Sequence, residues 1–366
     1  MVLIIQKHLA VGLVLGLMLS GLPTASAEDA PRIQAKHAVV MSECGAIVYE
    51  NNARDRALIA STTKLLTAIL VLENCRLDES VLIKPEHCTV EGSSMYLRPG
   101  QSYTVEELLL GLLLVSGNDA ALALAEHVSG DAEAFVEEMN RKAAALSLGD
   151  SHFENPHGLD APQHYSSAYD LAKLMAYCMH NDCFSRLIRE KSCKIHGLSF
   201  VNHNKLLRLC HGCLGGKTGY TKAAGRCLVS CCEREGTRFY CVTLQDPQDW
   251  QDHQRLYDWA FDRYTVRRPD RETGYRIPVV GGRASSIEIV AQPVEILMEK
   301  DQVLEICEEL PPFAFAPIQA GEQAGRLRIL ANGQVLAETK LVYAESVPSL
   351  GSRPNLWERL RYATAR

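Results

Sequence analysis

The sequence predicts a mixed α/β (α+β) domain, with an antiparallel sheet and a helical insertion, followed by a small all-β domain. Its 366 residues exceed the usual size of a single domain. Strand-like runs near His37 and near Gly225 flank a long stretch of helical periodicity, which indicates a sheet built from both ends of the first domain. From about Asp270 the pattern changes to short apolar runs broken by proline, glycine or acidic turns, which is typical of an all-β domain.

Residues 1–27 have the pattern of a secretory signal peptide. Lys7 gives a weakly basic start, Leu9 to Leu22 is a largely apolar core, and Ala25-Ser26-Ala27 is a cleavage pattern of small residues. A mature chain that starts at Glu28 and works outside the cytoplasmic membrane is therefore expected, with an uncleaved membrane anchor as the alternative.

The net charge of the chain is −6, whereas domains that bind nucleic acid are typically basic. Nucleic acid is therefore not expected as a partner.

The first domain, expected over residues 28–265, begins and ends with paired strands. His37–Met41 and Ala46–Tyr49 are expected to form one hairpin, and Gly225–Cys232 and Arg238–Leu244 a second. Helices are expected between and after these hairpins, over Ala60–Ile69, Val105–Val115, Asp119–Val128, Ala132–Leu146, Ser167–Met179 and Gln251–Tyr264.

The all-β domain is expected over residues 270–345 and carries no catalytic constellation. Its strands are expected over Tyr275–Val280, Ser286–Ala291, Val294–Met298, Arg326–Leu330 and Gln334–Val342. In the tail, residues 346–366, a short helix would place Leu356, Trp357 and Leu360 on one face among arginines. Such a helix can lie on the surface of an anionic membrane, and a solvated tail is the alternative.

The stretch Ser61-Thr62-Thr63-Lys64 contains the first candidate catalytic pair. Three positions along a helix is nearly one turn, so the side chains of Ser61 and Lys64 are expected to project from the same face. A serine hydroxyl is a poor nucleophile until a base takes its proton, and a lysine amine can do this only when its pKa is depressed. The apolar residues between Leu65 and Leu72 supply dry surroundings that disfavour the ammonium form. Taken alone, the pair is by default interpreted as a helix-capping serine followed by a solvated lysine.

Two further motifs follow in the order that active-site serine penicillin-binding proteins and class A β-lactamases share. Ser116-Gly117-Asn118 follows an apolar run, and Lys217-Thr218-Gly219 follows Gly215-Gly216. Gly117 stands where the Ser-Asp-Asn form has aspartate, which the broader Ser-x-Asn pattern allows. A Lys-Thr-Gly triplet arises by chance only about 0.1 times in a chain of this length. The three motifs together therefore indicate an active-site serine enzyme.

From about His37 to Phe261 the chain resembles the serine D-Ala-D-Ala carboxypeptidases, that is, the low-molecular-mass penicillin-binding proteins. The likeness covers the three motifs and also the segments His152–Leu159, Asn202–Leu207 and Ala224–Leu228. The resemblance implies the penicillin-binding/β-lactamase-like transpeptidase fold, in which the three motifs meet in one groove. It also implies a C-terminal β domain and a tail helix that associates with the membrane.

The resemblance implies that Ser61 attacks the carbonyl between the two terminal D-alanines of a peptidoglycan stem pentapeptide. This attack releases D-alanine and forms an acyl-enzyme. Lys64 would be the base for acylation and would assist deacylation by water. Ser116 would relay a proton toward the leaving amine, and Asn118 would hydrogen-bond the substrate backbone. Because β-lactams mimic the D-Ala-D-Ala end of the substrate, they are expected to acylate Ser61.

The same resemblance assigns substrate binding to the segment that begins at Lys217. Lys217 and Thr218 would bind the terminal carboxylate, and Gly219 would leave room for a substrate strand to pair alongside. The backbone N–H groups of Ser61 and Tyr220 would form the oxyanion hole, in which each donor is worth about 3–4 kcal/mol.

The chain departs from several family members just before the closing helix. Gln248-Asp249-Trp250 stands where those members have an arginine that helps to hold the substrate carboxylate. Carboxylate recognition is therefore expected to depend more on Lys217 and Thr218. His157, in the loop after Pro156, is expected to shape the groove rather than to act in catalysis.

Other functions remain as alternatives at this stage. A class A-like serine β-lactamase needs a loop glutamate that activates water, and Glu154 is a candidate, but Gly158 stands where the accompanying asparagine would be. A DD-endopeptidase that cuts crosslinks between stem peptides has the same motifs. A catalytically silent wall-binding protein is disfavoured because the motif residues are intact. No metal or organic cofactor is implied.

The 13 cysteines are unusual for an exported chain. Such a number normally suggests disulfides, yet several cysteines, among them Cys231 and Cys232, stand where a small buried hydrophobic residue would serve. A reducing, anaerobic setting is the preferred explanation. Cys210-x-x-Cys213 with His203 and His211 nearby is the alternative of half a metal site, although no second Cys-x-x-Cys exists.

Overall fold

The computed structural model describes residues 30–268 and 274–351, which divide into two compact units. Residues 30–266 together with Leu297–Lys300 form the sheet–helix unit, and residues 267–268, 274–296 and 301–351 form the β unit. Within these ranges, no helix combines the length and the apolar character needed to cross a bilayer. The expected signal peptide and the expected tail helix around Leu356 lie outside the described residues.

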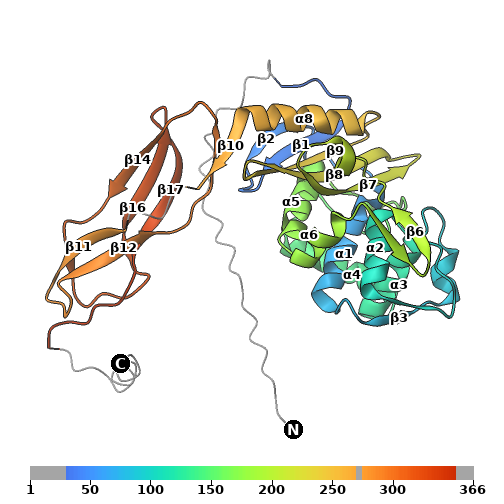
Figure 1. Cartoon of the computed structure of the whole chain (residues 1–366), viewed down its shortest axis with the longest axis horizontal. Coiled ribbons are helices and arrows are strands. Elements are labelled where there is room, and N and C mark those ends of the chain that lie inside the picture. The colour runs from blue at the N-terminus through green and yellow to red at the C-terminus, as the bar shows by residue number, and fades with distance from the viewer. Residues whose placement is uncertain (1–29, 269–273, 352–366) are drawn as a thin grey trace, which may run out of the picture. The chain divides into compact units, whose positions relative to one another are not determined.

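A five-stranded antiparallel sheet forms the centre of the sheet–helix unit, with the strand order β2-β1-β9-β8-β7. The N-terminal hairpin consists of β1 (His37–Ser42) and β2 (Ile47–Asn51). The other strands are β7 (Cys213–Thr221), β8 (Gly225–Arg234) and β9 (Thr237–Leu244). Because β1 pairs with β9, both ends of this part of the chain meet in one sheet (Figure 1), as the sequence predicts. This order leaves β7 at one edge.

Helices cover both faces of this sheet (Figure 1). α8 (Asp249–Arg263) packs against β8 and β9 on one face, and α5 (Ala168–Met179) packs against β1 and β9 on the other. The insertion between β2 and β7 also contains two small two-stranded sheets, β3–β4 (Ser80–Leu82 and Ser102–Thr104) and β5–β6 (Ser192–Ile195 and Leu198–Val201). Its remaining helices are η1 (Ala60–Thr63), α1 (Lys64–Asn74), η2 (Pro85–Thr89), α2 (Val105–Leu114), α3 (Asn118–Ser129), α4 (Ala132–Ala145), α6 (Asp182–Ile188) and α7 (Leu206–Leu209).

The helix that follows Ser61 is held by its own packing. Every residue of α1 from Lys64 to Val71 is buried, and Leu65, Leu66 and Ile69 join the large apolar core between the sheet and the insertion helices. Fully burying an aliphatic side chain of this size contributes about 1.5–3 kcal/mol. The first residue of α1 is therefore fixed in position by the burial of the residues that follow it.

The secondary structure differs from the sequence prediction in two ways here. The single helix expected from Ala60 begins instead with the 3-10 turn η1, in which Thr62 N donates to Ile59 O over 3.2 Å. The sequence did not predict strand β7 or the short elements β3, η2, β4, α6, β5, β6 and α7. Each of the short elements contains fewer than eight residues, which is too few for a periodicity of apolar residues to be recognised.

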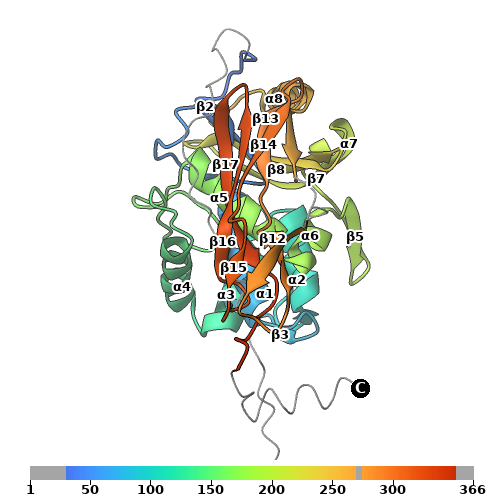
Figure 2. The same cartoon turned by 90° about the vertical axis from the view of Figure 1, so that its left-hand side faces the viewer.

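The β unit contains a six-stranded sheet with the order β14-β16-β17-β12-β11-β15. β11 (Tyr275–Val280) and β12 (Ser286–Ala291) have the predicted bounds, and β16 (Gln323–Ala331) and β17 (Gln334–Tyr343) form a long hairpin beside them (Figure 2). The two strands that the sequence did not predict are β14 (Leu304–Glu309) and β15 (Ala314–Phe315). All pairs are antiparallel except β11 with β15.

One strand expected in the β domain lies elsewhere. The run Val294–Met298 forms β13 (Ile296–Glu299), which pairs with β10 (Tyr264–Arg267) in a separate two-stranded sheet. Leu297 is packed in the core beneath α8, together with Tyr264. The apolar pattern identified a strand correctly but does not specify which strand it pairs with.

Candidate active site

Ser61 and Lys64 meet at the junction of η1 and α1. The Lys64 Nζ atom lies 2.8 Å from Ser61 Oγ, within hydrogen-bond distance. Lys64 is fully buried, whereas Ser61 is half-buried and so accessible from solvent. The expectation that the two side chains project from the same face agrees with this geometry.

Two carbonyl oxygens from distant parts of the chain also accept hydrogen bonds from Lys64. Asn118 Oδ1 lies 2.6 Å from the Nζ atom and the backbone oxygen of His157 lies 2.5 Å from it. Burial lowers the pKa of the Lys64 amine well below its usual range, and the nearby charge of Lys217 lowers it further, against a smaller opposing effect of Asp119. The site thus favours an uncharged amine next to Ser61.

Ser116 and Lys217 form a second buried pair. Lys217 Nζ donates to Ser116 Oγ over 2.9 Å and to the backbone oxygen of Thr218 over 2.8 Å. Burial lowers the pKa of Lys217 to about 7. All three motifs therefore converge, because Lys64 contacts Asn118 and Lys217 contacts Ser116 of the same motif.

The turn after α2 contains Ser116 and Gly117. Ser116, not Gly117, has the positive φ, at 65°. Gly117 is required for space instead, since a Cβ there would lie 2.7 Å from Asp119 Oδ1. The left-handed backbone of Ser116 is the kind of local strain that is retained at functional sites.

Asp119 organises the wall of the site beside Asn118, and the sequence analysis gave it no role. Its carboxylate accepts hydrogen bonds from Ser94 Oγ (2.6 Å), Met95 N (3.0 Å) and Leu97 N (3.1 Å). Asn118 Nδ2 donates to the backbone oxygen of Glu91 over 2.7 Å, which turns its Oδ1 toward Lys64. An acidic residue in the first turn of a helix, directly after a motif, is the signal that could have found this residue.

The loop that contains His157 packs directly on η1. Gly158 has φ 90°, and a Cβ there would collide with the backbone oxygen of Ala60 and lie 2.9 Å from Thr63 Oγ1. His164 Nδ1 accepts from Glu154 N over 3.0 Å, so its Nε2 carries the proton and donates to Thr63 Oγ1 over 2.7 Å. Burial lowers the pKa of His164 to about 4 and that of His157 to about 3, so both rings are neutral near pH 7.

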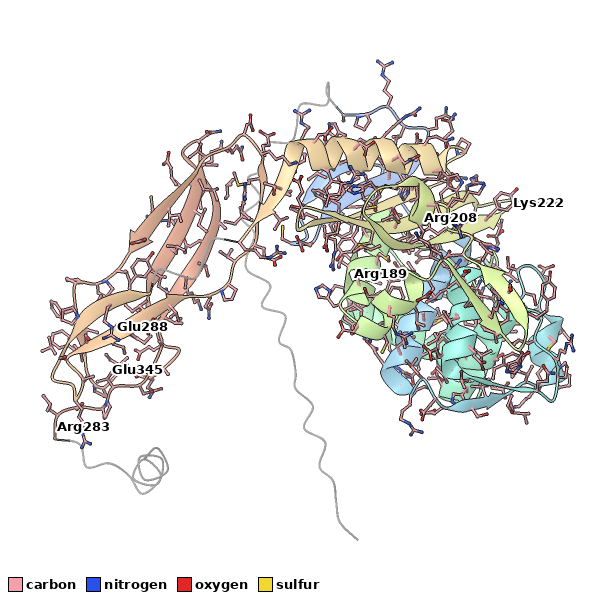
Figure 3. The ribbon with its side chains drawn as sticks, in the orientation of Figure 1. Arg189, Arg208, Lys222, Arg283, Glu288 and Glu345 are labelled. Atoms are coloured by element: carbon pink, nitrogen blue, oxygen red, sulfur yellow. The ribbon has the colours of Figure 1, made fainter. Side chains whose placement is uncertain are left out.

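Strand β7 runs against the same turn. A Cβ at Gly219 would lie 3.0 Å from Ile59 O and from Ser61 N, so no larger residue fits without displacing the backbone of the candidate nucleophile. Thr218 is half-buried and Tyr220 is 67% exposed. Lys222 lies in the turn after β7, and its side chain points away from the rest of the unit (Figure 3). The exposed end of β7 therefore adjoins Ser61.

A family model described as D-alanyl-D-alanine carboxypeptidase matches residues 24–248. The chain belongs to the D-alanyl-D-alanine carboxypeptidase family. It is thus a serine-type carboxypeptidase, and the resemblance inferred from the motifs is confirmed. Among curated proteins, the chain is similar to the D-alanyl-D-alanine carboxypeptidase DacF of Bacillus subtilis, with 31% identity over 94% of this chain and 96% of the relative. DacC of Escherichia coli is 28% identical over 92% of this chain and 91% of its own length.

Solved structures of the family share the fold of the chain. Penicillin binding protein 5 from Haemophilus influenzae matches with a TM-score of 0.79 and 28% identity, over 87% of this chain and 99% of that one. Penicillin binding protein 6B from Escherichia coli matches with a TM-score of 0.72 and 28% identity, over 85% and 96% respectively. The predicted penicillin-binding transpeptidase fold is confirmed. The alternatives of a β-lactamase and an endopeptidase are not favoured.

The cysteines do not form the half metal site that the sequence left as an alternative. Cys210 Sγ lies 3.7 Å from Cys232 Sγ, but His203 and His211 do not join Cys210 and Cys213 in a cluster of ligand atoms. All 13 cysteines lie in the described ranges and none is joined to another by a disulfide. The reducing setting stays a prediction.

Proposed function

We propose that this carboxypeptidase removes the terminal D-alanine from peptidoglycan stem pentapeptides through an acyl-enzyme on Ser61. The observation that supports this proposal most directly is the buried Lys64 amine 2.8 Å from Ser61 Oγ. A depressed amine pKa allows the lysine to act as a general base at neutral pH.

The three hydrogen-bond partners of Lys64 define how it takes the proton. An uncharged amine has two N–H bonds and one lone pair. The carbonyl oxygens of Asn118 and His157 can only accept, so they occupy the two N–H bonds. The lone pair is left for the hydroxyl proton of Ser61. As the Ser61 oxygen bonds to the substrate carbonyl carbon, that proton passes to Lys64.

The second pair completes the transfer to the leaving group. Ser116 Oγ is hydrogen-bonded to Lys217. It lies in the same motif as Asn118, which is hydrogen-bonded to Lys64. We assign Ser116 the relay of a proton to the amine of the departing D-alanine, and Asn118 a hydrogen bond to the substrate backbone. The proton that Lys64 took from Ser61 leaves with this amine through Ser116, so Lys64 is uncharged again. Water then attacks the ester carbonyl and gives a proton to Lys64, which passes it to Ser61 Oγ as the ester bond breaks.

Strand β7 is assigned the binding of the substrate. Lys217 and Thr218 would hold the terminal carboxylate, and an extended peptide would pair with the edge of β7, where Gly219 has no side chain. The N–H groups of Ser61 and Tyr220 would stabilise the oxyanion. The arginine that several family members have before the closing helix is absent; Asp249 there accepts from Arg226 over 2.7 Å.

Features of the loop at Gly158 argue against rapid hydrolysis of a penicillin adduct. Glu154 is exposed and accepts from Gln163 N over 2.7 Å. Gly158 leaves no space for the asparagine that would accompany a water-activating glutamate. β-Lactams are therefore proposed as long-lived covalent inhibitors.

The decisive experiment measures both reactions on the same preparation. We expect release of the terminal alanine from diacyl-Lys-D-Ala-D-Ala but not from the same peptide ending in D-Ala-L-Ala. After brief exposure to penicillin, mass spectrometry should find a persistent adduct on the peptide that contains Ser61. Rapid turnover without an adduct would identify a β-lactamase, and cleavage confined to crosslinked stem peptides would identify an endopeptidase.

The dependence of activity on pH tests the role of Lys217. We expect kcat/KM for diacyl-Lys-D-Ala-D-Ala to fall as the pH rises above about 7, where free Lys217 loses its charge. In the substrate complex, the bound carboxylate favours the ammonium form of Lys217, so kcat should fall only at a higher pH than kcat/KM does. The matched control is the same peptide with a C-terminal amide, for which no alkaline fall of this kind is expected. An equal fall for both peptides would contradict the assignment.

The place of action is proposed as the outer side of the cytoplasmic membrane, because the substrate is wall peptide. The expected signal peptide over residues 1–27 supports this. We also propose peripheral attachment through the tail, residues 346–366, by its basic amphipathic pattern.

A further inference from the structure

Cys75, Glu79 and His127 form a cluster outside the active site that the sequence analysis did not single out. One ligand atom from each residue lies within 4.8 Å of the other two. His127 Nε2 and Glu79 Oε2 are 3.1 Å apart. Among the residues that the structure describes, this is the one set of three histidine, cysteine, aspartate or glutamate side chains whose ligand atoms all lie within 4.8 Å of one another.

The three residues are held by the ends of three separate elements. Cys75 ends α1, and its N–H donates to Val71 O over 2.9 Å. Glu79 immediately precedes β3, and its backbone oxygen accepts from Val105 N over 2.9 Å. His127 lies in the last turn of α3. The backbone positions of the donors are therefore fixed without any ion.

The cluster is sheltered but open to solvent. The side chain of Glu79 is 29% exposed and that of His127 is 25% exposed, and Cys75 is also half-buried. An ion can therefore enter, and a water molecule can complete its coordination.

We propose that Cys75, Glu79 and His127 bind a zinc-type divalent cation. A thiolate, an imidazole and a carboxylate are the ligands that Zn²⁺ prefers, at about 2.3 Å from sulfur and about 2.0 Å from nitrogen and oxygen. Tetrahedral geometry then places the ligand atoms about 3.3–3.6 Å from one another, which small side-chain rotations can reach from the present spacing. The thiolate disfavours Mg²⁺ and Ca²⁺, which take oxygen ligands.

Binding exchanges protons for the ion. The Cys75 thiol loses its proton to the solvent as the sulfur–metal bond forms. The neutral His127 ring binds through Nε2 with its proton on Nδ1, so the Nε2–Glu79 hydrogen bond is replaced by two bonds to the metal. Because the metal displaces the proton of the Cys75 thiol, affinity should increase with pH.

The site would join the far ends of the two helices that carry active-site residues. α1 starts at Lys64 and α3 starts at Asn118, and the side chains of these two residues are hydrogen-bonded to each other at the N-terminal ends of the helices. The two helices pack side by side (Figure 1), and Cys75 and His127 lie at their other ends. The expected role of the metal is to stabilise this helix pair, without contact to substrate.

The chain provides a matched control next to the cluster. His87 Nε2 and Glu126 Oε2 are 2.7 Å apart, so they form a similar histidine–carboxylate pair beside α3. Lys84 is bonded to the same carboxylate, and the nearby Cys88 thiol donates to Leu97 O instead. This pair has no thiol ligand and should not bind zinc tightly.

The test titrates the reduced, metal-free full chain with Co²⁺ and with Zn²⁺ in competition with a chromophoric chelator. We expect one equivalent of Co²⁺ to give a near-ultraviolet thiolate-to-cobalt absorption that Zn²⁺ removes. Cys75→Ser and His127→Gln should weaken this site at least about 100-fold. His87→Gln and Cys193→Ser, a half-buried thiol elsewhere in the unit, should not.

A second readout keeps the proposal falsifiable where a variant folds poorly. Zn²⁺ should raise the Tm of the wild type and of His87→Gln, but not that of His127→Gln. Co²⁺ absorption that survives unchanged in Cys75→Ser would overturn the proposal, as would a wild type with no Zn²⁺-dependent rise in Tm.

Discussion

The variants Ser61→Ala and Lys64→Met are each expected to lose at least about 10³-fold in kcat/KM for D-alanine release, with the fold intact. Ser61 supplies the attacking oxygen, and without it no acyl-enzyme forms. Methionine fills the volume of the lysine but cannot take a proton, so the hydroxyl of Ser61 stays a poor nucleophile. The rate of penicillin acylation should fall in parallel, because it uses the same first step.

The double variant separates a cooperating pair from two independent contributions. Since Lys64 acts only through Ser61, the double variant is expected to be no slower than the worse single variant. Multiplied losses would instead indicate that Lys64 serves a second step independent of Ser61. Lys36→Met, a change at an exposed lysine of the same unit, is the control and should keep wild-type activity.

The effect of Lys64→Met on stability should be small by comparison. The variant removes the donor to Asn118 Oδ1 and His157 O, and each unsatisfied buried oxygen costs about 1–3 kcal/mol. It also removes the cost of burying an amine, which offsets part of this loss. We expect the free energy of unfolding, measured with denaturant, to change by less than about 2 kcal/mol. If Lys64→Met is unfolded under the assay conditions used for the wild type, its loss of activity says nothing about catalysis. The activity of Ser61→Ala would then test the proposal.

The residues that could be identified from the sequence are those that act through the chemistry of their own side chains. Ser61, Lys64 and Lys217 stand in short motifs, and the spacing of Ser61 and Lys64 predicted that their side chains project from the same face, where they lie 2.8 Å apart. The sheet with a helical insertion was equally predictable, because long apolar runs mark its central strands and its helices.

The residues that it missed act through contacts between distant segments. The backbone oxygen of His157 holds Lys64 although 93 positions separate the two, and a backbone atom leaves no trace in residue type. Asp119 acts on a loop more than 20 positions earlier. The pairing of β13 with β10 was missed for the same reason, since periodicity indicates that a strand forms but not which strand lies beside it.

Gly158→Ala is expected to reduce both stability and activity more than any other single change to alanine at a glycine of this site. A side chain at φ 90° costs about 1–2 kcal/mol on its own. Here the added carbon would also collide with the backbone oxygen of Ala60, which cannot rotate away as a flexible side chain would. Overpacking of this kind adds about 1–3 kcal/mol, so we expect a total loss of about 2–5 kcal/mol in the free energy of unfolding.

The collision lies between the two segments that position the catalytic pair, so activity should fall beyond the effect on folding. Ala60 precedes Ser61, and Gly158 follows His157, whose backbone oxygen accepts from Lys64. Displacing either segment by about 1 Å is enough to lower turnover about 100-fold. The matched control is Gly130→Ala, because Gly130 has φ 89° with no atom within 4 Å of an added Cβ. It should lose about 1–2 kcal/mol and keep full activity. Equal effects of the two substitutions would mean that backbone strain alone, and not the contact with Ala60, explains why glycine is required at position 158.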